Sequence, residues 1–136
     1  MRAALLATAL LAFAEGAGAD TLTAFHTPSG NIHCLGLVGE GGALVDCEIV
    51  ETEGSLPPRP AGCELDWGHR FLVTEGTSGE MVCAGDTVRD PHGAVLPYGS
   101  SLSLGAVTCL STREGLECFN PSGHGFFLSR RLQRVF

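Results

Sequence analysis

Six cysteines, separated by 13, 16, 20, 26 and 9 residues, constrain the fold of this chain more than any other feature. None belongs to a C-x-x-C pair, and the separations do not match the short cysteine and histidine spacings of structural zinc sites. An even number of cysteines in a small exported domain is typical of disulfides, which persist in oxidising compartments. The sequence therefore predicts a small domain held by three disulfides.

The N-terminus has the pattern of a cleavable export signal. Arg2 precedes an apolar run, and Ala17-Gly18-Ala19 supplies the small residues that a signal peptidase needs. We expect cleavage before Asp20, with residues 1–19 as signal peptide and 20–136 as a single disulfide-stabilised β domain. The apolar run is about half as long as a membrane-spanning helix, so no membrane anchor is expected after cleavage. The predicted location is periplasmic or secreted, from a bacterium.

The mature chain has the pattern of β-structure. Short apolar runs alternate with polar residues, glycine is abundant, and no helical periodicity is evident after residue 20. The prolines in 56–60 and 91–97 predict two extended connections without a regular hydrogen-bond ladder. The expected fold is all-β, a small antiparallel sandwich or barrel of disulfide-bridged hairpins, with strands over 22–26, 31–38, 43–50, 69–75, 80–84, 101–110, 115–120 and 125–129.

Hairpin geometry predicts two of the disulfides. When a two-residue turn joins antiparallel strands, each residue of one strand has a fixed partner on the other. A bridge is feasible where that pair is not hydrogen-bonded, because the strands there bring side chains closest. The expected pairs are Cys34 with Cys47 about a turn at Glu40-Gly41, and Cys109 with Cys118 about a turn at Arg113-Glu114.

The third disulfide, Cys63 with Cys83, follows by elimination. A turn at Thr77-Ser78 would place Leu72, and not Cys63, opposite Cys83, so this bridge is expected to tie the proline-rich loop to a strand. Each bridge could contribute roughly 3 kcal/mol by loop-closure entropy. Against a typical domain stability of about 5 to 15 kcal/mol, that contribution is large.

Two similar segments flank the cysteine hairpins. Thr27 to Asn31 runs into the first hairpin and Asn120 to His124 runs out of the last, and both contain Pro-Ser-Gly. These three residues suit positions two to four of a type I turn. Either the two hairpins form a pseudo-symmetric unit or a common turn tripeptide recurs by chance.

The order of motifs resembles that of a known family. A TPSGNI-x-C motif opens the mature chain at Thr27 and a GHGF-x-LSR motif closes it at Arg130, with the intervening motifs at Cys47–Ile49, Cys63–Gly68, Cys83–Thr87 and Leu96–Gly99. In these respects the chain resembles a domain-of-unknown-function family of small exported bacterial proteins with six cysteines. The resemblance spans nearly the whole mature chain. It implies export, and it implies no activity, substrate or partner.

The charge of the chain excludes some partners. The formal net charge is −7, which disfavours nucleic acid and anionic membrane surfaces because phosphate binding needs a basic surface. Seven carboxylates lie between Glu40 and Asp66 with only Arg59 among them, which predicts a solvated acidic face. A basic patch near the C-terminus could pair with that face within or between molecules, through Arg130, Arg131 and Arg134.

Histidines provide the candidate metal and catalytic residues. His26 and His33 lie on either side of a predicted turn and are the best metal candidates, with hydrogen-bonding or surface histidines as the alternative. His124, between two glycines and near Ser122, suggests a hydrolase, although there is no G-x-S-x-G elbow. The alternative is that the glycines allow a bulge or turn before the last strand. No cofactor is expected.

Two aromatic residues beside glycines are the candidate binding residues. Trp67 and Tyr98 could form a ligand platform, together with His124, or could simply cap the core. By elimination, the sequence favours a non-catalytic extracytoplasmic binding or envelope-associated module with an unknown ligand or protein partner. One alternative is a small exported enzyme, metal-dependent or hydrolytic, centred on His124. The other is a secreted inhibitor or interaction protein that presents a loop such as 56–62.

Overall fold

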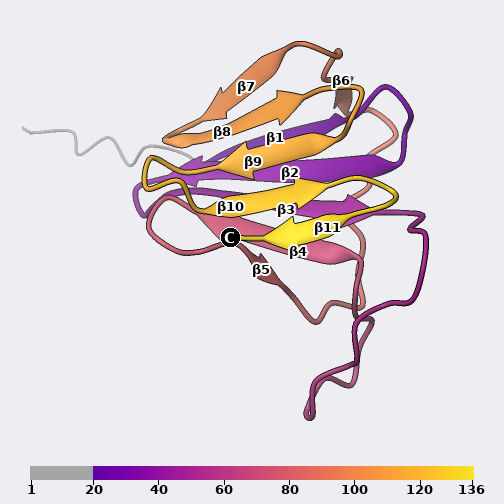
Figure 1. Ribbon diagram of the computed structural model, residues 1–136. Helices are drawn as coiled ribbons and strands as arrows, with labels where there is room; N and C mark the ends of the chain where they lie inside the picture. Colours follow the sequence, from indigo (N-terminus) through magenta and orange to yellow (C-terminus); the bar gives the residue numbers. More distant parts are fainter. Residues whose placement is uncertain (1–19) are drawn as a thin grey trace, which may run out of the picture.

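A computed structural model describes residues 20–136, which form two facing β-sheets and no helix (Figure 1). The first sheet has the order β5-β4-β3-β2-β1-β6, and its strands are β1 (Thr21–His26), β2 (Ile32–Gly39), β3 (Gly42–Ile49), β4 (Arg70–Thr74), β5 (Glu80–Met81) and β6 (Ala94–Val95). The second has the order β11-β10-β9-β8-β7, and its strands are β7 (Ser101–Leu104), β8 (Val107–Ser111), β9 (Leu116–Phe119), β10 (Gly125–Leu128) and β11 (Gln133–Val135). All pairings are antiparallel except that of β1 with β6.

The predicted all-β fold is confirmed, and of the two expected architectures the sandwich is the one that forms. The predicted signal peptide, residues 1–19, lies outside the described residues. Within the described part of the chain, no helix is long and apolar enough to cross a membrane.

Alternating burial along β2 and β3 explains why the sheets face each other. Ile32 and Cys34 of β2, and Val45, Cys47 and Ile49 of β3, are buried, while the residues between them are only partly buried. Successive side chains of a strand point to opposite faces, so one face of the hairpin lies against the second sheet. The core is therefore the layer between the two sheets.

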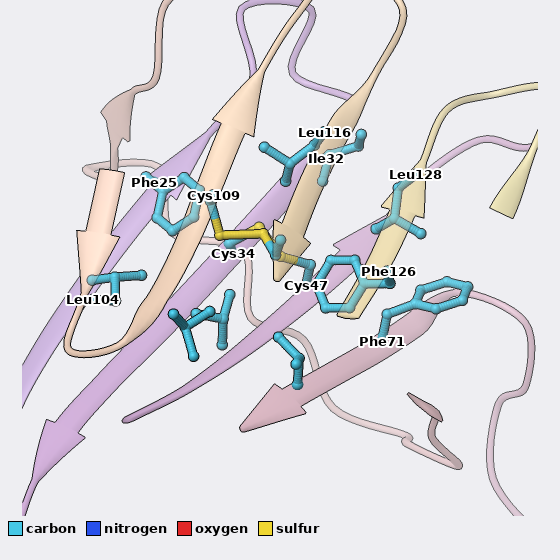
Figure 2. Packing of buried hydrophobic residues seen from close by; sticks show 14 of the residues in the cluster. Phe25, Ile32, Cys34, Cys47, Phe71, Leu104, Cys109, Leu116, Phe126 and Leu128 are labelled. Atoms are coloured by element: carbon cyan, nitrogen blue, oxygen red, sulfur yellow. A yellow bond between two sulfur atoms is a disulfide. The ribbon is translucent and has the colours of Figure 1, made fainter. Parts of the chain in front are cut away.

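Two disulfides meet in this core, and both were expected from hairpin register. Cys34 lies opposite Cys47 and Cys109 lies opposite Cys118, with a Cα–Cα separation of 4.1 Å in each pair. All four cysteines are at most 1% exposed. Figure 2 shows the two bridges next to each other, among buried side chains that include Phe25, Phe71, Phe126, Leu116 and Leu128. Each sheet thus contributes one bridge to the centre of the core.

The third disulfide, Cys63–Cys83, is also confirmed, and it lies outside the core. Cys83 is exposed and Cys63 partly buried, with their Cα atoms 5.8 Å apart. Neither residue belongs to a strand, so the expectation that this bridge ties the loop to a strand is wrong: β5 ends at Met81, before Cys83. This bridge ties the long connection between β3 and β4 to the segment after β5.

The two Pro-Ser-Gly segments form the expected turns. The Gly30 N–H donates to the Thr27 carbonyl over 2.9 Å, and the Gly123 N–H donates to the Asn120 carbonyl over 3.0 Å. The first turn joins β1 to β2 and the second joins β9 to β10. The two bridged hairpins that these turns flank belong to opposite sheets and meet across the core (Figure 2).

Two predicted strands and one turn were wrong. Of the strand expected over 80–84 only Glu80–Met81 forms. Residues 101–110 form not one strand but β7 and the start of β8, separated by Gly105 at φ 56°. A positive φ suits glycine and reverses the chain, and the buried positions change from even-numbered Leu104 before the turn to odd-numbered Val107 and Cys109 after it. The turn expected at Thr77-Ser78 is also wrong, because Leu72 pairs with Glu80 and not with Cys83.

Two short strands were not predicted. β6 lies inside the 91–97 connection and pairs in parallel with the end of β1, and β11 pairs with β10 near the C-terminus. Strands of two or three residues are too short to show a period, so only the partner strand reveals them.

Candidate ligand-binding cleft

A cleft of about 420 Å³ opens where the end of β3 meets the proline-rich connection. Residues of β3, β4, the β3–β4 connection and the segment after β5 line it, namely Glu48, Ile49, Val50, Leu56, Arg59, Asp66, Trp67, His69, Arg70, Ala84, Asp86 and Arg89. Figure 1 shows the β3–β4 connection, in magenta, extending well beyond the sandwich. The cleft therefore lies between the sandwich and a long projecting loop.

Backbone hydrogen bonds and a disulfide hold the walls of the cleft together. Asp66 and Ala84 exchange backbone hydrogen bonds of 3.2 and 3.1 Å, close to the Cys63–Cys83 bridge. The Ile49 N–H donates to the His69 carbonyl over 2.9 Å. These contacts fix both ends of the loop, although its residues 53–62 are all exposed.

Leu56 of the loop packs against Gly68. A Cβ at position 68 would lie 2.8 Å from the Leu56 Cδ2 atom, and the φ of 103° at this position favours glycine. The prolines at 57, 58 and 60 restrict the backbone that follows Leu56. The loop is consequently stiff at the side that faces the cleft.

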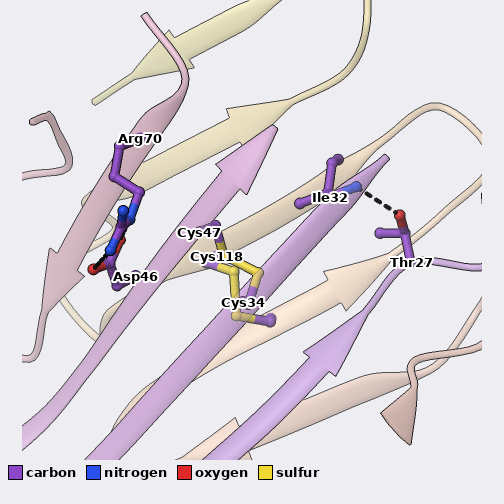
Figure 3. The surroundings of a disulfide bond; sticks show 8 residues. Thr27, Ile32, Cys34, Asp46, Cys47, Arg70 and Cys118 are labelled. Atoms are coloured by element: carbon purple, nitrogen blue, oxygen red, sulfur yellow. Dashed lines mark hydrogen bonds and ion pairs between the residues drawn. A yellow bond between two sulfur atoms is a disulfide. The ribbon is translucent and has the colours of Figure 1, made fainter. Parts of the chain in front are cut away.

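Arg70 connects the cleft to the sandwich. Its Nε and Nη2 donate to the two oxygens of Asp46 over 2.6 and 3.0 Å (Figure 3). Its Nη1 donates to the carbonyl and the carboxylate of Asp86. Burial alone would lower the pKa of Arg70, but the hydrogen bonds and charges of the two aspartates outweigh it and raise the pKa. The guanidinium is 9% exposed, remains charged, and holds the 86–89 segment against β4.

Glu48 forms a second polar anchor beside Arg70. It accepts hydrogen bonds from the Thr87 hydroxyl over 2.6 Å and from Arg89 over 3.3 Å. Burial would raise the pKa of Glu48, but these hydrogen bonds, the charge of Arg89 and the Val88 N–H together lower it below its ordinary value. Two charged residues of adjacent strands thus fix the segment that closes one side of the cleft.

Trp67 is the sequence-predicted binding residue that lines this cleft. Its side chain is partly buried, and its indole Nε1–H is buried without an acceptor in the described part of the chain. An indole nitrogen can only donate, and an unpaired buried donor costs about 1 to 3 kcal/mol. Trp67 therefore brings to the cleft a donor that is covered in the empty cleft and that a ligand oxygen would satisfy once the ring turns toward it.

His69 also lines the cleft, and the backbone holds one of its ring nitrogens. Its Nδ1 lies 2.8 Å from the Ile49 carbonyl oxygen. Because a carbonyl only accepts, Nδ1 is the donor in this contact. The sequence alone gave no reason to prefer His69 to the other histidines.

The other candidate binding residues lie elsewhere. Tyr98 is 38% exposed and lines a separate cleft of about 190 Å³, where the Arg113 guanidinium lies 5.0 Å from the centre of its ring. His124 is exposed and lines neither cleft. The structure does not bring Trp67, Tyr98 and His124 together.

The catalytic candidates His124 and Ser122 lie on an exposed turn. Their backbone N–H groups both donate to the Asn120 side-chain oxygen, over 3.1 and 3.0 Å. Asn120 is buried, and its amide also donates to the carbonyls of Thr74 and Thr77. The contacts of this segment are those of a turn fixed by a buried asparagine.

The metal candidates His26 and His33 are cross-strand partners whose ring centres are 5.4 Å apart. Each lies within hydrogen-bond distance of a turn carbonyl, His26 Nδ1 of Thr27 at 2.9 Å and His33 Nε2 of Gly30 at 2.8 Å. Among residues 20–136, no three or more histidine, cysteine or carboxylate side chains are grouped as a metal site. The pair is brought together as expected, in a hydrogen-bonded arrangement.

The C-terminal arginines pair with the acidic region inside the molecule. Arg130 lies 3.1 Å from Glu51, and Arg131 lies 3.6 Å from Glu53. All four side chains are more than half exposed, so these pairs add little stability. The Glu53 N–H also donates to the Arg130 carbonyl over 2.7 Å, which attaches the start of the loop to the second sheet.

Comparison with known proteins identifies one family. A family model described as a family of unknown function (DUF6636) matches residues 4–136. No curated protein and no solved structure matches the chain.

The lowered pKa of Glu48 predicts how acid affects stability. A carboxylate whose pKa is lowered by folding stabilises the native state above its ordinary pKa of 4.5, and this contribution is lost as the pH falls through the lower folded value. Urea unfolding midpoints measured below pH 4.5 should therefore fall more steeply for the wild type than for Glu48→Gln. As a control, Glu40→Gln removes an exposed carboxylate and should leave the wild-type slope unchanged. Equal slopes for wild type and Glu48→Gln would contradict the assignment.

Proposed function

Because the chain belongs to the DUF6636 family, whose function is unknown, we propose a function from its own cleft. The protein is an exported, non-catalytic binding module that holds a small polar ligand between the proline-rich loop and the sandwich. The unpaired indole N–H of Trp67 carries this proposal, since a buried donor in a cleft wall is a feature that a ligand acceptor would complete.

The way the cleft is built also supports a binding role. The loop adds none of its residues to the buried apolar core, yet a disulfide, two backbone bonds and the Arg70 and Glu48 contacts all hold its surroundings in place. A binding site held rigid before the ligand arrives loses less entropy when the ligand binds. So many contacts around a peripheral loop are expected if the loop forms part of a binding site, and a loop that only connects two strands does not need them.

Export is supported by two independent features. The N-terminal 19 residues have the pattern of a signal peptide, and three disulfides require an oxidising compartment. We place the mature protein in the periplasm or the surrounding medium, where it could act as a free or envelope-associated binding module.

Cell fractionation with intact-mass measurement tests the location. The protein should be recovered outside the cytoplasm with Asp20 as its first residue and no free thiol. Recovery from the cytoplasm with an uncleaved N-terminus would contradict export.

A ligand panel tests the binding role. Sugars, amino acids, short peptides, nucleotides and inorganic anions are added to the oxidised protein, and melting temperature is measured, since a ligand that binds only the native state raises it. At least one class should raise the melting temperature of the wild type and of Tyr98→Phe, and should bind Trp67→Phe about tenfold more weakly or worse, because that change removes the indole donor. Undiminished binding to Trp67→Phe, or no response to any class, would contradict the proposal.

An interaction protein remains the second candidate, because one observation favours it. Residues 53–62 are all exposed, and Leu56 and Leu65 are 43% and 52% exposed on or beside the loop. In that case the loop itself would bind a larger partner. The ligand panel separates the two, since an interaction loop would give no response to small compounds.

A further inference from the structure

The charged groups of the cleft divide into those already paired and those that are not. Arg70 uses four donor contacts on Asp46 and Asp86, and Glu48 accepts from Thr87 and Arg89. These groups are occupied in holding the cleft together. They leave little capacity for a ligand.

Two donors of the loop remain without partners. Arg59 forms no ion pair or side-chain hydrogen bond among residues 20–136, and the Trp67 Nε1–H has no acceptor there. Both side chains line the cleft and belong to the connection between β3 and β4. This wall of the cleft is therefore rich in unpaired donors and would attract an oxygen-bearing, negatively charged group.

Two carboxylates of the cleft can still accept from a ligand, Asp66 because it is unpaired within residues 20–136 and Asp86 because it is only partly used. The Asp66 carboxylate lines the cleft and has no side-chain partner within the described chain. Asp86 is 82% exposed and uses one carboxylate oxygen for Arg70. A ligand that carries an ammonium group would find these carboxylates in the same cleft as the donors.

The anionic group that fits best is a carboxylate. A guanidinium binds planar carboxylates and phosphates in a bidentate manner, so Arg59 alone does not distinguish them. Three carboxylates and three arginines line the cleft, and of the arginines only Arg59 is without an ion pair in the described chain, so a phosphate with nearly two negative charges exceeds the one unpaired positive charge. A carboxylate brings one charge and accepts from both a guanidinium and an indole N–H.

The volume of the cleft sets the size of the ligand. At about 420 Å³ it falls within the range of roughly 300 to 1,000 Å³ that small-molecule sites occupy. A ligand of one to a few amino-acid residues is of this size.

We propose that the cleft recognises a zwitterionic ligand, an amino-acid derivative or short peptide with both a free carboxylate and a free ammonium group. Arg59 binds the carboxylate, which also accepts from the Trp67 indole N–H once that ring turns toward the cleft, and Asp66 with Asp86 binds the ammonium. This proposal rests on the function proposed above and adds the chemical class of the ligand.

The single tryptophan of the chain makes the test direct. The indole N–H gives one signal in a nitrogen–proton correlation spectrum of the ¹⁵N-labelled, oxidised protein. The probes are a pool of mixed-sequence tripeptides with free termini, the same pool with amidated C-termini, the same pool with acetylated N-termini, and inorganic phosphate. The free pool should shift the indole signal, while each capped pool and phosphate should bind about tenfold more weakly or worse.

Variants assign the carboxylate contact to Arg59. Arg59→Gln should weaken binding of the free pool about tenfold or more without loss of stability, because Arg59 has no partner to lose. Arg131→Gln removes an arginine that is 86% exposed and does not line the cleft, and should bind like the wild type.

Three results would overturn the proposal: no response to the free pool, equal responses to free and amidated pools, or tighter binding of phosphate. If in any of these cases another class, such as a sugar, binds in a Trp67-dependent way, the binding function stands and only the ligand class is wrong. If no class of compound binds, here or in the ligand panel, the proposed binding function and the proposed ligand class are both wrong.

Discussion

Two buried disulfides that meet between the sheets are the constraint on which the rest of the structure depends. Cys34–Cys47 joins β2 to β3 in one sheet, and Cys109–Cys118 joins β8 to β9 in the other. Each closes a hairpin whose neighbouring strands extend the sheet on both sides. Together they place four nearly inaccessible sulfurs at the centre of the core, where they also serve as apolar packing. A domain of this size has a marginal core, and these bridges limit the freedom of its unfolded chain.

The third disulfide has a different role because it lies at the periphery. Cys63–Cys83 holds two irregular segments beside each other, and Arg70 and Glu48 attach one of those segments to β3 and β4. Strong polar contacts are placed here on the outer surface of a sheet, where they add nothing to the apolar core. The molecule thus has a sandwich made by apolar burial and two bridges, and a cleft made by one bridge and a network of charges.

Much of the fold was predictable from the sequence because its strongest signals are local. Alternation along β2 and β3 and the hairpin spacing of the cysteines fixed two disulfides and the register of two strand pairs, and elimination supplied the third bridge. The wrong predictions concern turns and short strands, which the local pattern of apolar residues does not reveal. Gly105 reverses the chain within a largely apolar run, and Leu72 pairs with Glu80 across a loop longer than a two-residue turn. The two-residue strand β6 forms by pairing with the end of β1.

The site was predictable only in part. Trp67 drew notice as an aromatic residue beside glycine, and it does line a cleft. The roles of Arg70, Asp46 and Glu48 could not be derived, because they depend on the pairing of β3 with β4 across a connection of twenty residues. Their one signal in the sequence is charge at the outward positions of strands that are otherwise apolar. His69 is one of five histidines in the sequence, and only its place in the wall of the cleft distinguishes it from the others in the described chain.

Stepwise reduction of the folded protein tests most directly whether two disulfides hold the core and the third holds the cleft. Native protein is exposed to increasing dithiothreitol, the released thiols are alkylated, and the modified cysteines are identified by peptide mass. Because exposure makes a disulfide easier to reduce, Cys63 and Cys83 should be modified first, in a species that still unfolds cooperatively while its Trp67 indole signal moves. If Cys34, Cys47, Cys109 and Cys118 are modified at the same reductant concentration, or if the species reduced only at Cys63 and Cys83 is unfolded, the account is contradicted.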